Sequence, residues 1–138
     1  MVEIAMTYQG DLHCRVTHAP SGTEMTTDAP LDSHGKGESF SPTDLVATAL
    51  GTCILTVMGI AARSMRIDLA GAKAIVRKEM VAKPARRIGV LAVTIEVPAL
   101  LDEAQRQRLI AAAMTCPVHK GLHPDIEMPI QFKWADAG

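Results

Sequence analysis

The longest apolar segment of the chain covers residues 45–62, and its pattern predicts a central helix. Ser41 is a favourable N-cap because its hydroxyl can accept a hydrogen bond from a backbone N–H of the first turn. Pro42 suits the first helical position, and Asp44 completes a capping box with Ser41. Apolar residues point in nearly every direction around this helix, so we expect it to be buried on all sides.

Two glycines, Gly51 and Gly59, interrupt the apolar segment. Each costs about 1 kcal/mol relative to alanine in a helix interior, so close packing against another backbone is the expected compensation. The segment is near the minimum length of a membrane span. Its threonines, and the charges of Asp44 and Arg63 at its ends, favour a buried helix of a globular protein. The N-terminus has no signal-peptide pattern, so we expect a cytoplasmic protein without a membrane partner.

The segment before the helix predicts three strands and a long loop. Alternating apolar and polar residues indicate half-buried strands at residues 2–8 and 12–17. A short third strand is expected at residues 24–27. Residues 28–40 are polar and rich in glycine and serine, which is typical of a loop that is functional or mobile.

The segment after the helix predicts two long strands at residues 72–81 and 88–97, with Leu91, Val93, Ile95 and Val97 on one face of the second. An amphipathic helix follows at residues 102–113, capped by Asp102, with Leu109, Ile110 and Ala113 facing inward. Residues 126–134 alternate as a final strand.

The predicted order is therefore βββ-α-ββ-α-β in one domain over residues 1–138, which is the α+β class. The central helix carries more apolar surface than so small a chain needs to bury. We expect a second copy of the chain to cover it, which makes a homodimer.

The charge balance excludes two classes of partner. Fourteen basic and fifteen acidic residues give a net charge of −1, so there is no electrostatic footprint for nucleic acid or an anionic membrane. The chain holds three cysteines and no export signal. Reduced thiols are therefore expected rather than a framework of structural disulfides.

Cys53 and Cys116 each have two interpretations. Cys53, in the middle of the central helix, is either a small buried apolar residue or a reactive thiol. Cys116 precedes Pro117, which predicts that it caps a new short helix whose N-terminus favours the thiolate. The other interpretation of Cys116 is an ordinary turn residue. Cys14 lies in a strand of alternating pattern and is expected in the core.

His119 follows Cys116 by three residues, which is half of a metal-binding pattern. A second close pair of ligands is missing, so the sequence predicts no metal and no cofactor. A nucleophilic pair of His119 with Cys53 or Cys116, as in cysteine hydrolases, is a further hypothesis. A third orienting group is not visible for it.

Two segments carry a family resemblance: SFSPTDLVATALGTC at residues 39–53, and TCPVHKGL at residues 115–122. With the terminal amphipathic strand, they resemble the OsmC/Ohr superfamily, the osmotically induced and organic-hydroperoxide-resistance proteins and their OsmC-like relatives. The resemblance covers almost the whole chain. It implies an α+β intertwined homodimer with two sheets wrapped around paired central helices.

The resemblance also implies thiol peroxidase chemistry in the stress response. The cysteine matching Cys53 is peroxidatic and becomes a sulfenic acid. The cysteine matching Cys116 resolves it as an intramolecular disulfide, which an external dithiol of lipoyl or thioredoxin type reduces. Small, organic hydroperoxides are the substrates that an apolar pocket at a dimer interface would favour.

The sequence departs from the family at the groups that activate the thiolate. The family uses an early arginine and a glutamate directly after the proline that opens the helix. Here Thr43 follows Pro42, and Arg15 is the arginine that precedes the helix. The missing glutamate favours an alternative function, a binding protein on the same scaffold that holds a small apolar ligand without turnover.

Overall fold

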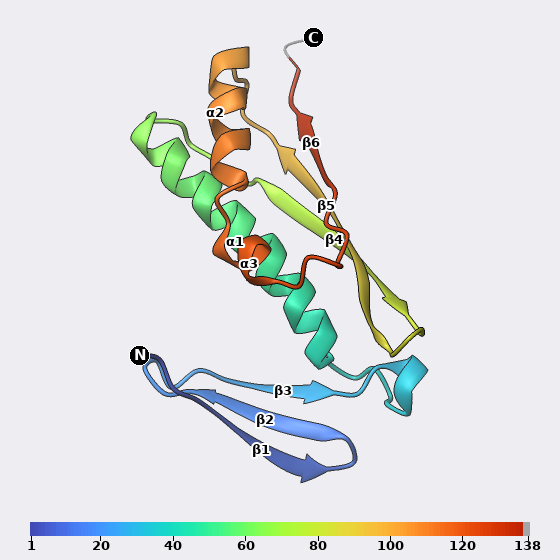
Figure 1. Cartoon of the computed structure of the whole chain (residues 1–138). Helices are drawn as coiled ribbons and strands as arrows, with labels where there is room; N and C mark the ends of the chain where they lie inside the picture. The colour runs from blue at the N-terminus through green and yellow to red at the C-terminus, as the bar shows by residue number, and fades with distance from the viewer. Residues whose placement is uncertain (137–138) are drawn as a thin grey trace. The chain divides into compact units, whose positions relative to one another are not determined.

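The computed structural model of the protein describes residues 1–136, which belong to two compact units that meet between Val46 and Ala47. The elements follow the order β1-β2-β3-η1-α1-β4-β5-α2-α3-β6, drawn in Figure 1. The class is α+β with two three-stranded sheets, as predicted. That the chain forms a single domain stays a prediction. The helix α1 is continuous across the boundary between the two units.

The first unit contains an antiparallel sheet of β1 (Ile4–Gly10), β2 (His13–His18) and β3 (Glu24–Asp28) in that order. Between β1 and β2 the chain turns through Asp11 and Leu12, whose φ angles of 51° and 62° are left-handed. All three predicted strands are therefore confirmed.

The predicted half-burial of β1 is wrong for the single chain. β1 is an edge strand that pairs only with β2. Its alternate apolar side chains share one face of the strand and are exposed, with exposed fractions of 49% for Ile4, 63% for Met6 and 64% for Tyr8. A row of exposed apolar side chains on an edge strand is typical of a surface that another molecule covers.

The loop at residues 28–40 is organised by its first residue. Asp28 is 1% exposed, and its Oδ2 accepts backbone N–H groups from Lys36 at 3.2 Å and Glu38 at 3.0 Å. A short 3-10 helix, η1 (Leu31–Ser33), lies inside the loop. The loop is thus closed on itself by a buried carboxylate before the chain enters the central helix.

The central helix α1 (Pro42–Ser64) begins as predicted. Ser41 Oγ accepts the N–H of Asp44 at 3.1 Å, and Asp44 Oδ2 accepts the N–H of Ser41 at 3.0 Å. This reciprocal pair satisfies two backbone donors at the helix start, which is the role of a capping box.

Within the single chain α1 is buried along one stripe only, not on all sides. The buried residues recur at helical spacing: Ala47, Leu50, Gly51, Ile54, Met58 and Ala62. A second stripe is exposed and consists of Thr48, Thr52, Thr56 and Ile60. Among residues 1–136, α1 is the one helix long and apolar enough to cross a membrane, which is weak evidence because core helices meet the same criteria.

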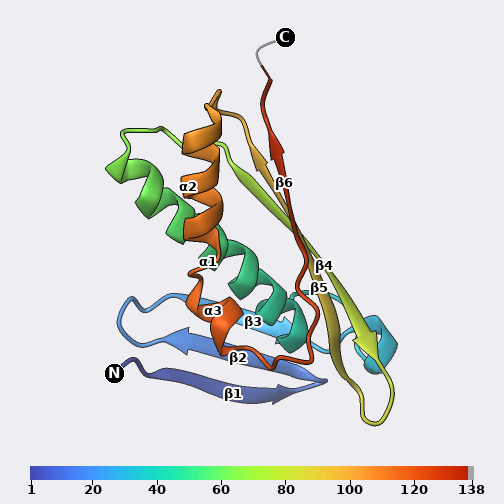
Figure 2. The same cartoon turned by 45° about the horizontal axis from the view of Figure 1, so that its top comes forward.

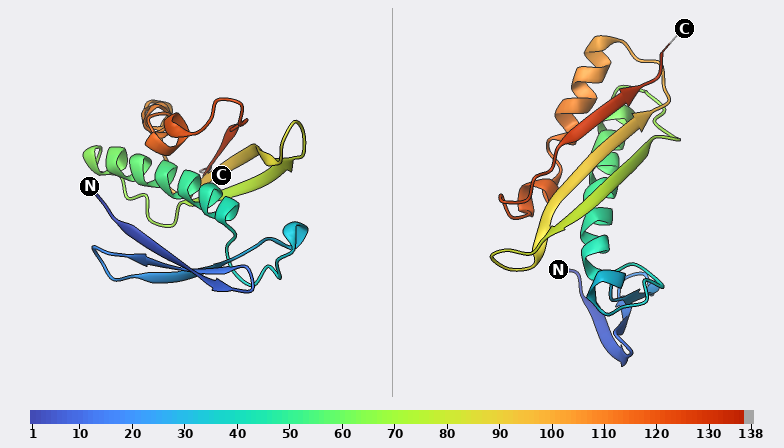
Figure 3. Two further views of the ribbon diagram at one scale, coloured as in Figure 1. Left: turned by 60° about the horizontal axis from the view of Figure 1, so that its bottom comes forward. Right: turned by 90° about the vertical axis from the view of Figure 1, so that its right-hand side faces the viewer.

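The second unit contains a sheet in the order β4-β5-β6, made of β4 (Lys73–Val81), β5 (Arg87–Val97) and β6 (Ile130–Trp134). β4 and β5 form an antiparallel hairpin, whereas β5 and β6 are parallel. Parallel neighbours need a crossover, which here carries α2 (Glu103–Ala113) and α3 (Pro117–Gly121). Figures 2 and 3 show α2 beside α1 on one face of this sheet.

The core of this unit lies between the sheet and the two helices. From β5 it receives the four side chains predicted to share a face, Leu91, Val93, Ile95 and Val97. The helices add Leu50, Ile54, Met58, Leu109 and Ala113. Ile110, predicted to face inward, is only half-buried, and the final strand is shorter than predicted at its N-terminal end.

Gly51 shows why the central helix tolerates a glycine. A Cβ at this position would lie 3.0 Å from Val76 Cγ2 and 3.4 Å from Ala74 Cβ, both on β4. Gly51 is therefore closely packed, but against strand side chains, so the prediction of packing against another backbone is wrong. A Cβ at Gly59 would meet nothing within 4 Å among the described residues.

Candidate functional site

The Cys-Pro turn builds one half of the site. Cys116 is the N-cap of α3, and its Sγ accepts the backbone N–H of His119 at 3.4 Å. Pro117 occupies the first position of α3, where a missing N–H costs nothing. The predicted capping role of Cys116 is confirmed, and its side chain is fully buried.

Cys53 provides the other half, from the middle of α1. Its thiol lies close enough to the thiol of Cys116 to act on the pKa of Cys116, although the two residues are far apart in the sequence. Cys53 is half-buried and Cys116 is buried, and neither forms a disulfide. Both belong to the second unit, so α1 and the turn after α2 bring two free thiols together within one compact body.

The pKa of the Cys116 thiol is raised above its usual range. Burial is the largest cause, and the interaction with Cys53 acts in the same direction. The backbone N–H groups of His119 and Val118 lower the pKa but do not outweigh burial. The helix start thus favours the Cys116 thiolate as expected, but burial outweighs this effect because desolvation disfavours the charged form of a thiol.

Cys14 lies elsewhere. It is on β2 in the Met1–Val46 unit, opposite Tyr8 on β1 and Thr27 on β3, and it is half-buried rather than fully in the core. It is a free thiol with no sulfur partner on its own sheet.

Arg15 and Thr43 also belong to the first unit. The guanidinium of Arg15 forms an ion pair with Glu24 across the β2–β3 pair. The pair lies at an open pocket of about 330 Å³. Thr43 is in the first turn of α1, with its hydroxyl 3.2 Å from Ser41 Oγ. The role of Arg15 beside the Cys53 thiolate stays a prediction.

His119 does not act as a ring partner of Cys116, because Cys116 Sγ contacts its backbone N–H. Its side chain lines an open pocket of about 550 Å³ with Lys120, Leu122 and Met128 among other residues. A Cys–His nucleophile needs the imidazole, not the peptide group, within hydrogen-bond reach of sulfur. The geometry at Cys116 therefore gives no support to the hydrolase hypothesis.

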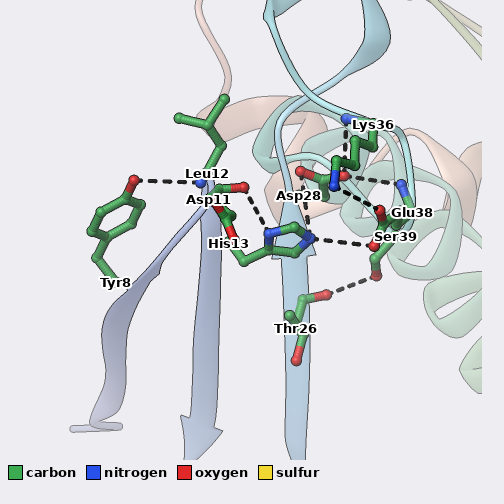
Figure 4. Close-up of polar contacts among 9 residues, drawn as sticks. All are labelled: Tyr8, Asp11, Leu12, His13, Thr26, Asp28, Lys36, Glu38 and Ser39. Carbon is green, nitrogen blue, oxygen red and sulfur yellow. Dashed lines mark hydrogen bonds and ion pairs between the residues drawn. The ribbon is translucent and has the colours of Figure 1, made fainter.

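One group within residues 1–136 has the composition of a metal site. His13, Asp28 and Glu38 each offer a ligand atom, and these atoms all lie within 4.8 Å of one another (Figure 4). Sequence analysis missed this group because its members come from two strands and a loop. Only the β2–β3 register, in which His13 is opposite Asp28, could have indicated part of it.

An α+β chain whose core joins a mid-helix cysteine to a buried Cys-Pro cysteine defines a class of two-cysteine thiol protein. Within that class the chain belongs to the OsmC family, since the family model for OsmC-like protein matches residues 35–131. The match includes both Cys53 and Cys116 and crosses the boundary between the two compact units.

Solved structures agree with this family. A crystal structure from Psychrobacter arcticus 273-4, described as a proposed osmotic stress induced and detoxification response protein, is 46% identical, with a TM-score of 0.90 and 96% of each chain covered. An organic hydroperoxide resistance protein OsmC from Legionella pneumophila is 13% identical, with a TM-score of 0.78 and the same coverage.

A third structure is the organic hydroperoxide resistance protein OhrB of Bacillus subtilis. It is 15% identical with a TM-score of 0.71, covering 96% of this chain and 98% of that one. At these identities the Legionella and Bacillus structures establish the shared fold. None of the curated proteins compared with the sequence matches it.

Proposed function

We propose that the protein is a thiol-dependent peroxidase that reduces small organic hydroperoxides through Cys53 and Cys116. The observation that carries the proposal is the proximity of the two thiols within one unit, where Cys53 acts on the pKa of Cys116. In the proposed pair, the half-buried Cys53 thiol is accessible to the substrate. The buried Cys116 thiol reacts afterwards with the oxidised Cys53.

The proposed cycle has three balanced steps. The Cys53 thiolate attacks the terminal oxygen of ROOH, which breaks the O–O bond, releases the alcohol after protonation and leaves a sulfenic acid. The Cys116 sulfur then attacks the Cys53 sulfur, expelling hydroxide, which leaves as water with the thiol proton. An external dithiol reduces the resulting disulfide by exchange and is itself oxidised.

The raised pKa of Cys116 fits the second role. A thiol that keeps its proton at neutral pH does not compete with Cys53 for peroxide, because the thiolate is the nucleophile. The same proton is available when hydroxide leaves the sulfenic acid. The environment of Cys116 thus suits a resolving rather than an attacking residue.

Names of family members support the substrate class. The Legionella and Bacillus structures are described as organic hydroperoxide resistance proteins, and they share this fold. On this basis we propose that our chain reduces organic hydroperoxides, with a lipoyl or thioredoxin-type dithiol as the reductant. We further propose a cytoplasmic location for the protein.

We further propose a homodimer whose interface includes α1. The chain leaves apolar side chains exposed on α1 and β1, among them Ile60 at 65% and Met6 at 63%. The thiolate of Cys53 also needs a cation, for which Arg15 is our candidate. A residue at position 43 is ten positions from Cys53 on one helix, which corresponds to about 15 Å of rise. A group there would therefore serve the thiolate of a second copy more readily than its own.

One feature favours a second function, a binding protein for a small apolar ligand without turnover. The family places a glutamate after the helix-opening proline, where this chain has Thr43. Without that carboxylate the orientation of a thiolate-activating arginine has less support. The same scaffold would then hold a ligand at the cysteines rather than reduce it.

A coupled assay of hydroperoxide consumption separates these functions. Reduced protein with dihydrolipoamide or thioredoxin is expected to consume an organic hydroperoxide, and Cys53→Ser to abolish consumption. Cys116→Ser should complete one turnover and leave a sulfenic acid that a dimedone-type probe traps. Cys14→Ser, on the other unit, is the matched control and should keep its activity. Activity that survives Cys53→Ser would reject the peroxidase and leave the binding protein.

A further inference from the structure

The strongest unassigned feature is the group of His13, Asp28 and Glu38 at one end of the first sheet, which we call the HDE cluster. Figure 4 shows the imidazole of His13 pointing between the two carboxylates. Nε2 lies 3.7 Å from Asp28 Oδ1 and 3.6 Å from Glu38 Oε2. His13 is at the start of β2, Asp28 ends β3 and Glu38 belongs to the following loop.

A hydrogen bond at Nδ1, on the other side of the ring from the carboxylates, fixes the orientation of the His13 imidazole. Nδ1 lies 2.7 Å from the backbone carbonyl oxygen of Asp11. A carbonyl only accepts, so Nδ1 carries the proton and donates it. In the neutral ring Nε2 then has a free lone pair directed at the carboxylates. Metal-binding histidines are commonly held in this way, with the other ring N–H on a backbone carbonyl.

The carboxylate of Asp28 supplies an independent indication of a ligand. Its side chain is 1% exposed, and Oδ1 has no hydrogen-bond partner among the described residues. Oδ2, in contrast, accepts the N–H groups of Lys36 and Glu38. A buried carboxylate oxygen without a partner is costly, and this one faces His13 Nε2.

The distances fit a metal better than a proton. A proton on Nε2 would make no proper hydrogen bond, because both oxygens lie beyond the usual N–H···O range of about 2.7–3.2 Å. Around a tetrahedral zinc ion with bonds near 2.0–2.1 Å, neighbouring ligand atoms are about 3.3 Å apart. The two distances from His13 Nε2 are a few tenths of an ångström longer than this, and all three ligand atoms lie within 4.8 Å of one another. Rotation of the exposed Glu38 side chain would bring its oxygen into such a site.

The loop is built so that Glu38 returns to this position. Gly35 packs directly on the backbone after Asp28, where a Cβ would lie 1.6 Å from the carbonyl oxygen of Ala29. Its N–H also bonds to the carbonyl of Pro30 at 3.0 Å. Only glycine allows this approach, so the chain reverses and carries the 57% exposed Glu38 back towards His13.

We propose that His13, Asp28 and Glu38 bind a divalent transition-metal cation, with zinc as the best-fitting ion. One imidazole nitrogen and two carboxylate oxygens are suitable zinc ligands, and water completes the coordination. The metal would join the β2–β3 sheet to the loop that precedes α1. This site lies in a different unit from Cys53 and Cys116, so the metal proposal does not depend on the peroxidase proposal.

The first test is equilibrium dialysis of the reduced full chain against zinc, followed by metal analysis. We expect one zinc per chain. Glu38→Gln and His13→Gln should weaken binding by more than about tenfold, since loss of even outer-shell partners commonly costs that much. His123→Gln is the matched control, because His123 is also beside a carboxylate, 3.8 Å from Asp125, but both are exposed. It should leave binding unchanged.

Thiols also bind zinc, so the second test identifies the ligands. Cys53→Ser should retain the zinc, and bound Co²⁺ should show no thiolate-to-metal charge-transfer band. Zinc should also raise the melting temperature of the wild type by mass action, but not that of Glu38→Gln. This variant should fold normally because the Glu38 side chain is exposed. Absence of bound zinc, binding that persists in both HDE variants, or binding lost in Cys53→Ser would overturn the proposal.

Discussion

The thiols of Cys53 and Cys116 lie close together, and the interaction with Cys53 contributes to the raised pKa of Cys116. A disulfide between two residues needs Cα atoms within about 7 Å. Proximity of the thiols in the reduced chain therefore brings the pair close to the arrangement that the proposed oxidation requires.

The raised pKa predicts a pH dependence. Below the usual thiol range Cys116 is protonated in both the folded and the unfolded chain, and its contribution to stability is complete. As pH rises through the unfolded thiol pKa and on to the raised folded value, the unfolded chain loses its proton first, so the stability contribution is lost. Urea unfolding of reduced wild type and Cys116→Ala across this range should show a smaller alkaline loss in the variant.

The same pair predicts the effect of removing Cys53. Cys53 raises the pKa of Cys116, so Cys53→Ala should lower it, while burial still holds it above the ordinary value. Thiolate ultraviolet absorbance of the Cys53→Ala and Cys14→Ala proteins against pH would measure this. A Cys116 titration at the same pH in both proteins would show that the two thiols do not interact.

Position 43 offers a test of the thiolate-activating group. Thr43→Glu restores the carboxylate of the family pattern, and we expect it to raise the rate at which Cys53 is alkylated at neutral pH if Arg15 is the cation. Ala104→Glu, an exposed change on α2 and outside the proposed interface, is the control. Equal alkylation profiles against pH for Thr43→Glu and the wild type would remove both Arg15 and Thr43 from the site.

The exposed stripe of α1 predicts a homodimer in sedimentation at micromolar concentration. Ile60→Lys should weaken association because it puts a charge at the 65% exposed apolar position on α1. Leu100→Lys is the matched control, since Leu100 is 64% exposed but lies outside α1 and β1. A folded wild-type monomer, or equal loss of association in both variants, would contradict an interface at α1.

The two glycines of α1 should respond differently to alanine. Gly59→Ala gains helix propensity without a contact, so it should raise the free energy of unfolding by about 1 kcal/mol. At Gly51 the new methyl must displace Val76, which offsets that gain. Urea unfolding of the two variants should therefore differ by about 1 kcal/mol, in favour of Gly59→Ala. Equal stabilities would show that Val76 yields without cost.

Local signals predicted much of the fold. The Ser41–Asp44 box, the Asp102 cap and the one-sided face of β5 depend on neighbours within a few residues, and each is confirmed. The capping role of Cys116 was likewise readable from Pro117. The raised pKa of Cys116 could not be predicted from the sequence. The effect of the helix start depends on neighbouring residues, whereas burial depends on distant parts of the core.

Long-range relations account for what the sequence could not provide. The proximity of Cys53 to Cys116 was suggested by family resemblance, since no periodicity connects a helix to a distant turn. His13 and Asp28 become neighbours only once β2 and β3 are in register. The exposure of β1 was missed because alternation shows that a strand has an apolar face but not whether the same chain covers it.

The crossover between β5 and β6 has a consequence for the order in which the chain is made. It places Cys116 near the end of the sequence, after α2, whereas Cys53 belongs to the first half. Chains are synthesised from the N-terminus, so every nascent molecule passes through a stage in which Cys53 has been made and Cys116 has not. In the proposed chemistry, a sulfenic acid formed then would be open to further, irreversible oxidation. Translation under peroxide stress would thus damage unfinished chains more than finished ones.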